Sequence, residues 1–78
     1  MIEATAIHEH MDVVGADGGH VGRVDKVMGQ DIELTKFDLG AGLKHHLIPL
    51  SWVEGVEDDT VRLSLTKDAA KAAWREKH

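Results

Sequence analysis

The strongest clue to the architecture is the run His45-His46-Leu47-Ile48-Pro49-Leu50-Ser51-Trp52-Val53. Its aliphatic side chains suit a core, but Pro49 lacks the backbone N–H that the interior of a strand requires. Trp52 adds a large apolar ring, whose indole N–H needs a partner where the ring is buried. The run therefore predicts a strand that bends or stops at Pro49, at the corner of a small closed β structure.

Length and composition bound the class of protein. The chain has 78 residues, which is enough for one domain with a modest core, and no cysteine for a disulfide or a thiolate metal site. No apolar run approaches the roughly 20 residues that span a bilayer, and the first residues lack the features of a secretory signal. We expect one cytoplasmic domain over residues 1–78, without membrane contact and without a cofactor.

The charge is acidic and uneven. A formal charge of −5 opposes the phosphate attraction that dominates nucleic-acid binding, so a nucleic-acid partner is not expected. Residues 67–78 carry +2, however, and residues 1–66 therefore carry −7. The basic segment is either a solvated helix face or a surface that docks on an acidic partner or a second copy. Binding to RNA or the ribosome is a lesser alternative, with contact through Lys71, Arg75 and Lys77.

Turn signals divide the first half of the chain. Residues 11–14 run into Asp17-Gly18, a dipeptide that supplies the positive φ angles of a tight hairpin. Residues 20–28 carry valines spaced by three, but Gly22 and the β-branched residues favour a strand with a bulge or bend near Gly22. Residues 2–10 are a lead-in or a short edge strand.

A second turn and a clear alternation follow. Residues 29–31 form the turn, and residues 32–37 alternate apolar and polar side chains, the pattern of a strand with one wet face. Residues 38–44 contain two glycines and no period, which is typical of a hairpin loop.

The C-terminal part of the chain is expected to form two strands and a helix. The strands are expected at residues 53–57 and 61–65, joined by a turn at Asp58-Asp59. Thr66 is a good N-cap, and residues 67–77 are rich in strong helix formers. The predicted docking face of this helix consists of Ala70, Ala73 and Trp74.

Two motifs resemble a known family. The opening of a PRC-barrel domain is similar to residues 11–27, which read Met11-Asp12-Val13-Val14-Gly15-Ala16-Asp17-Gly18-Gly19-His20-Val21-Gly22-Arg23-Val24-Asp25-Lys26-Val27. Its isoleucine–proline corner is similar to Leu47-Ile48-Pro49 followed by Trp52-Val53-Glu54-Gly55-Val56. With the paired His45-His46 and an ending in Trp74, the chain most resembles the small stand-alone bacterial proteins of domain-of-unknown-function family 2171 (DUF2171).

The resemblance implies a mainly β fold. It implies a small closed antiparallel β-barrel of about six strands over about residues 5–65, with a C-terminal helix over about residues 67–77. PRC-barrel domains occur in the photosynthetic reaction centre H subunit and in the ribosome maturation factor, where they are interaction modules and not enzymes. Under this reading Gly15, Gly18 and Gly22 turn or bend strands, and Pro49 marks the corner.

Histidine is the one unusual component, with six in 78 residues. His8 and His10 share a face if their segment is a strand, whereas the neighbours His45 and His46 point to opposite faces. These four are the candidate metal ligands, and Glu9 or Asp12 could assist. The alternative is a set of surface imidazoles with one buried ring.

No pattern pairs a nucleophile with a base, so we expect no enzyme. The leading function is a non-enzymatic interaction or adaptor module with an unidentified protein partner, which could self-associate as a homodimer. The alternative is a metal or small-ligand sensor that uses the four candidate histidines and His20. The candidate interaction residues are Lys71, Trp74, Arg75, His45 and His46.

Overall fold

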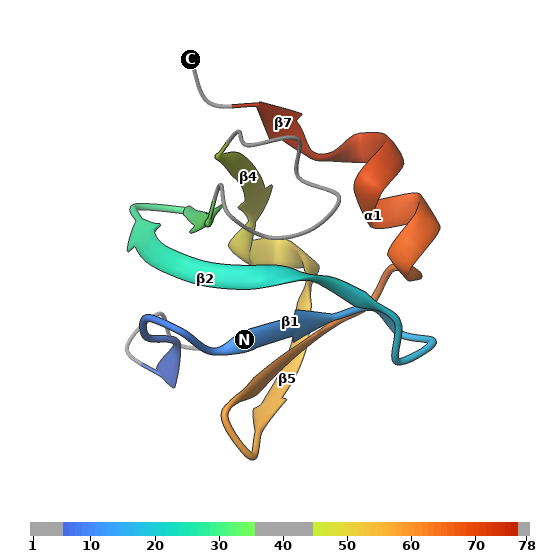
Figure 1. The fold of residues 1–78 in the computed structure, drawn as a ribbon, viewed down its shortest axis with the longest axis horizontal. Helices are drawn as coiled ribbons and strands as arrows, with labels where there is room; N and C mark the ends of the chain where they lie inside the picture. The colour runs from blue at the N-terminus through green and yellow to red at the C-terminus, as the bar shows by residue number, and fades with distance from the viewer. Residues whose placement is uncertain (1–5, 36–44, 77–78) are drawn as a thin grey trace.

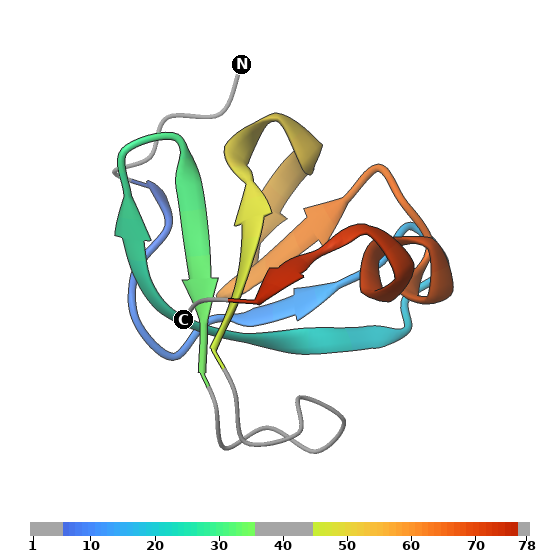
Figure 2. The ribbon, with the colours of Figure 1, turned by 90° about the horizontal axis from the view of Figure 1, so that it is seen from above.

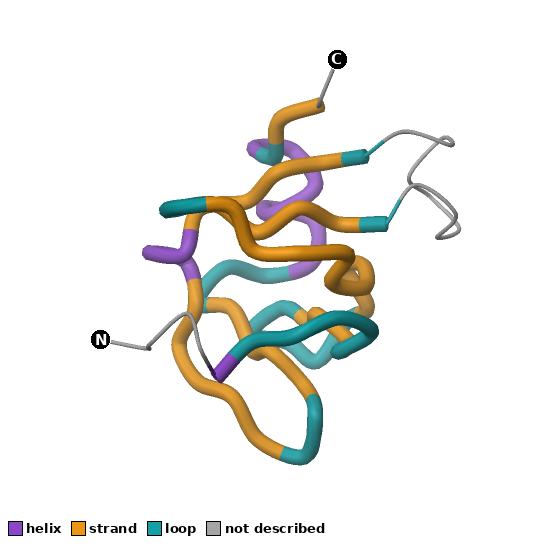
Figure 3. Tube along the Cα trace, turned by 90° about the vertical axis from the view of Figure 1, so that its left-hand side faces the viewer, coloured by secondary structure: helices purple, strands orange, loops and turns teal. Residues whose placement is uncertain are grey.

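The computed structural model describes residues 6–35 and 45–76, and these form a mainly β domain with one α-helix (Figure 3). Within those residues, no helix is long and apolar enough to cross a membrane. The predicted loop at 38–44, Phe37 and Lys77 lie outside the described residues. The elements are β1 (Asp12–Val14), β2 (His20–Met28), β3 (Asp31–Leu34), β4 (His46–Pro49), a 3-10 turn (Leu50–Trp52), β5 (Val53–Glu57), β6 (Thr60–Leu63), α1 (Lys67–Ala73) and β7 (Arg75–Glu76).

The strands form one curled sheet in the order β5-β6-β1-β2-β3-β4-β7. Figure 1 shows β2 crossing the middle of the molecule, and Figure 2 shows β3 and β4 running steeply across the direction of β1. The closed antiparallel barrel expected from the sequence is not what the described residues form. Their sheet has two ends, β5 and β7, and β1 pairs with β6 in parallel. These residues form seven strands where about six were expected, because the short strand β7 pairs with β4 and extends the sheet.

The long strand β2 belongs to both halves of the sheet because two bulges bend it. The first lies beside Gly22, where Val13 pairs with Gly22 but Val14 pairs with His20, as the sequence predicts. The second lies at Asp25. Its neighbours Val24 and Lys26 pair with consecutive residues of β3, so Asp25 itself has no partner there. Each bulge resets the alternation of side chains. The three-residue spacing of the valines is therefore compatible with a strand, as predicted.

The predicted corner at Pro49 is confirmed. β4 ends at Pro49, the chain makes a 3-10 turn over Leu50–Trp52, and β5 starts at Val53. Trp52 is only half-buried there and packs against the edge of the core. The chain thus changes direction where proline ends the ladder.

The core lies inside the curl of the sheet, where Ile32, Ile48, Val24, Val61 and Leu63 have no exposed surface. The lead-in segment adds Ile7, which is 5% exposed although residues 6–10 form no strand.

The C-terminal helix is shorter than predicted. Thr66 caps it as expected, its side chain accepting from the Ala69 N–H, but the helix ends at Ala73 and Trp74 is extended. Ala70 is fully buried, whereas Ala73 is exposed, so the expected docking face is only partly correct. The chain leaves the helix because the following residues pair with β4 as β7.

The turn between β1 and β2 is docked against the start of α1. Gly18 has φ +82°, as the predicted tight turn requires. The Ala16 N–H donates to the Leu65 carbonyl at 2.7 Å, and a Cβ on Gly15 would meet the Lys67 backbone nitrogen. Asp17 Oδ1 accepts from the N–H groups of Lys67 and Gly19 at 3.1 and 3.2 Å. These two hydrogen bonds, that of Lys67 first, lower the pKa of the Asp17 carboxyl.

Candidate functional site

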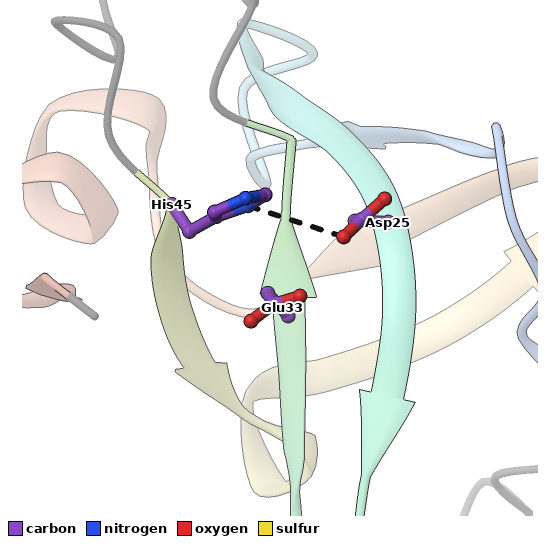
Figure 4. A group of neighbouring side chains, drawn as sticks. All are labelled: Asp25, Glu33 and His45. Atoms are coloured by element: carbon purple, nitrogen blue, oxygen red, sulfur yellow. Dashed lines mark ion pairs between the residues drawn. The ribbon is translucent and has the colours of Figure 1, made fainter. Parts of the chain in front are cut away.

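Three polar side chains converge on one side of the β2–β3–β4 half of the sheet. Asp25 comes from β2, Glu33 from β3, and His45 directly precedes β4 (Figure 4). One potential ligand atom from each residue lies within 4.8 Å of the other two. Among the described residues, this is the one group of three such side chains close enough to hold a metal ion.

Strand register brings these residues together. Lys26 pairs with Glu33 and His46 pairs with Leu34, so the three strands present neighbouring positions. The bulge at Asp25 adds a residue beside Lys26 without a partner of its own on β3. A bulge redirects side chains locally, and here it places the Asp25 carboxylate near Glu33 and His45.

Glu33 is the most informative member of the group because it is buried. The sequence predicts a wet face for its strand, but Glu33 is 1% exposed. Its Oε2 lies 3.9 Å from the Lys26 ammonium, whose side chain is half-exposed. Burying a carboxylate is costly unless cations or hydrogen-bond donors surround it. The prediction was wrong because alternation shows which side of a strand is polar, and not what covers that side.

His45 is oriented by a backbone carbonyl. Its Nδ1 lies 2.9 Å from the Leu34 oxygen, and since a carbonyl only accepts, Nδ1 must carry the proton. The same nitrogen is 3.9 Å from Asp25 Oδ2. A neutral ring in this tautomer keeps its lone pair on Nε2. The nitrogen that faces Asp25 is thus the protonated one, so an ion would bind either Nε2, with the carbonyl hydrogen bond kept as in many histidine ligands of metals, or Nδ1 in place of that hydrogen bond.

The donor set suits a borderline divalent metal. Two carboxylates and one imidazole match the ligands taken by Zn²⁺, Mn²⁺ and Fe²⁺, whereas Mg²⁺ and Ca²⁺ favour oxygen alone. Three protein ligands also leave positions for water or a small ligand.

The other predicted metal ligands do not join this group. His8 and His10 are exposed, and His10 has φ +71° in a turn, with Nε2 3.7 Å from Glu9. His46 is 3% exposed and points elsewhere: its ring stacks on Trp74 at 3.8 Å between centroids. His45 and His46 thus have different surroundings, as neighbours in a strand must. The exposed His20 starts β2 and is likewise outside the group.

The predicted interaction residues of the C-terminal segment make contacts within the domain. Trp74 is half-buried and packs on the core, with the Lys71 ammonium 5.7 Å from its ring centroid. The Arg75 guanidinium bonds to Asp31 Oδ1 at 2.8 Å, linking β7 to β3. These side chains therefore fasten the end of the chain to the sheet.

Sequence reasoning missed Asp25 and Glu33. Each stands as an ordinary polar residue in a strand, and their spacing from His45 matches no short metal motif. The signal that unites them is the pairing register of three strands, including the bulge.

Comparison with known proteins gives a family. No curated protein matches the chain. A family model described as "Uncharacterized protein conserved in bacteria (DUF2171)" matches residues 7–71, which include the Asp25–Glu33–His45 group and the turn between β1 and β2. This match covers most of the chain and confirms the DUF2171 part of the resemblance. The chain therefore belongs to the DUF2171 family of proteins conserved in bacteria.

Proposed function

We propose that this domain is a non-enzymatic module that binds one divalent transition metal ion through Asp25, Glu33 and His45. The observation that supports the proposal is the convergence of three ligand atoms within 4.8 Å, one of them on a carboxylate that is 1% exposed. The proposal keeps the metal-sensor alternative from the sequence but changes its ligands, since only His45 of the predicted histidines belongs to the group.

Metal binding would connect three strands. Asp25, Glu33 and His45 sit on or beside β2, β3 and β4, so a bound ion cross-links the half of the sheet that carries β7. An ion that binds only the folded domain stabilises it, by about 2.7 kcal/mol at a free concentration 100 times Kd. For a domain with so small a core this is a large effect, and it suits a sensor whose folded population reports metal.

The test is a titration of the tag-free protein with Zn²⁺, Mn²⁺ and Ni²⁺ in turn. We expect one ion per chain by native mass spectrometry and a rise in Tm with at least one of them. Glu33→Gln and His45→Gln should each weaken binding at least tenfold, because each removes a ligand of a three-ligand site. His20→Gln and Glu54→Gln are the matched controls and should bind as the wild type does.

Two results would contradict the proposal. One is a Tm that does not change with any of the three ions. The other is binding that survives in Glu33→Gln and His45→Gln but disappears in a variant lacking His8 and His10, which would move the site to that exposed pair. ¹⁵N chemical shifts of the His45 ring add a structural readout: binding through Nε2 keeps the Leu34 hydrogen bond, and binding through Nδ1 replaces it.

The interaction role expected from the sequence remains a second proposal, and the open sheet supports it because β5 has one neighbouring strand within the described residues. Kinship with PRC-barrel domains, in an open form of that fold, is likewise proposed, supported by the glycine turn and the Pro49 corner. Backbone NOEs between β5 and β7 would contradict the open form and would leave β5 without a free edge.

A further inference from the structure

Within the described residues, β5 has a free edge, and this feature is independent of the metal ligands. We propose that β5 (Val53–Glu57) accepts an extended, basic segment of a partner protein as an added strand. β5 is one end of the sheet in the described part of the chain and pairs there only with β6. Figure 1 shows the β5–β6 hairpin projecting from the body of the domain, away from α1 and β7.

The register of the hairpin shows which backbone groups face outward. Asp58 and Asp59 both have positive φ, and this two-residue turn closes on the pair Glu57 and Thr60. In an antiparallel ladder, pairs that exchange hydrogen bonds alternate with pairs that do not. The next pair, Val56 and Val61, therefore directs its N–H and C=O groups away from each other. Because the register shifts between Val53 and Gly55, the regular part of this edge is short, and within the described residues it presents the outward N–H and C=O of Val56 to an incoming strand.

The side chains select the partner. Residues 53–63 contain four acids and one arginine. Glu54 and Glu57 are exposed on β5 itself, and Asp58 and Asp59 are exposed at its tip. A strand laid along this edge with Lys or Arg facing these carboxylates gains cross-strand ion pairs. The backbone provides the pairing, and the charge provides the selection.

The same charges argue against a second copy at this edge. Two β5 strands paired about a twofold axis would bring Glu54 and Glu57 of one chain beside those of the other, and like charges placed opposite each other destabilise a sheet. In the basic C-terminal segment, two of the described cations already have partners within the domain: Arg75 pairs with Asp31, and Lys71 lies over Trp74. The occupant that fits is therefore a different, basic polypeptide segment.

The experiment is an NMR titration of the ¹⁵N-labelled full chain with a short peptide that alternates Val with Lys or Arg. We expect the largest amide shifts in β5, centred on Val56, and an affinity that falls steeply with added salt. N-methylating the peptide nitrogen that would donate to the Val56 carbonyl should weaken binding about threefold, since one backbone hydrogen bond of roughly 0.7 kcal/mol is lost.

Charge variants complete the test. The double variant Glu54→Lys/Glu57→Lys should lose the basic peptide and gain binding to a peptide that alternates Val with Glu. Asp68→Lys, an exposed control on α1 and away from the hairpin (Figure 1), should behave as the wild type. Shifts that map outside β5, or an N-methylated peptide that binds equally well, would overturn the proposal. A stable dimer with β5 in its interface would overturn it too. Metal binding uses other residues, so either proposal can fail alone.

Discussion

Two turns of the domain contain aspartate at or beside a residue of positive φ, and they have different roles. The turn at residues 15–19, here the docked turn, contains Asp17-Gly18 and packs against the start of α1. The turn at Asp58-Asp59, here the exposed turn, projects into solvent at the tip of the β5–β6 hairpin. Both reverse the chain through positive φ angles. The difference teaches that local chemistry makes a turn, whereas its contribution to stability depends on what packs against it.

The largest expected effect is that of Gly15→Ala in the docked turn. The added Cβ would meet the Lys67 backbone nitrogen and lie 2.8 Å from the Thr66 carbonyl carbon, and backbone cannot move aside as a flexible side chain does. We expect a loss of about 3 kcal/mol in the free energy of unfolding, measured by urea denaturation.

Gly55→Ala in β5 is the matched control for this prediction. A Cβ at Gly55 meets nothing within 4 Å, so the change should alter the free energy of unfolding by less than about 0.5 kcal/mol. Equal effects of the two substitutions would remove the distinction between a docked and an exposed region.

The next effect concerns acid. The hydrogen bonds from Lys67 and Gly19 lower the pKa of Asp17, so its carboxylate stabilises the fold at pH values above the ordinary Asp range near 4. That contribution is lost as the pH falls through the lowered native pKa. Asp17→Asn should therefore have a lower Tm than the wild type near neutral pH, and the difference should shrink as the pH is lowered.

Thr66→Ala is the control for the acid prediction. It removes a helix cap that does not titrate and should cost about 1 kcal/mol at every pH. If the Tm difference between Asp17→Asn and the wild type also stayed constant with pH, the charge of Asp17 would have no part in docking the helix.

The smallest effect is a gain in the exposed turn. Asp59 has φ +57°, a conformation that glycine adopts without strain, and Asp-Gly is a preferred pair for a two-residue hairpin turn. Asp59→Gly should raise the free energy of unfolding by about 0.5 kcal/mol, since relief of strain exceeds the added entropy of the unfolded chain. Asp59→Ala removes the charge but keeps the strain. A comparable gain in Asp59→Ala would assign the effect to charge instead.

Several elements could be predicted because their causes are local. Asp17-Gly18 and Asp58-Asp59 reverse the chain, Pro49 ends β4, and Thr66 caps α1, each through the chemistry of a few adjacent residues. The bulge beside Gly22 also belongs to this class.

The candidate metal site could not be predicted in the same way. Of its members, His45 was singled out by residue type, but Asp25 and Glu33 join it only through the register of β2, β3 and β4. The burial of Glu33 depends on what covers its side of the sheet, which an alternating pattern does not encode.

The sequence by itself determined the mainly β character, the places where the chain turns and the helix start at Thr66, since these depend on backbone preferences within a few residues. Only the tertiary structure decided that β1 pairs with β6 in parallel, that the residues after Trp74 form β7, and that Asp17 bonds to Lys67, a residue 50 positions away. Such contacts depend on which distant segments meet. That is settled by the packing of the whole core and not by any one stretch of the chain.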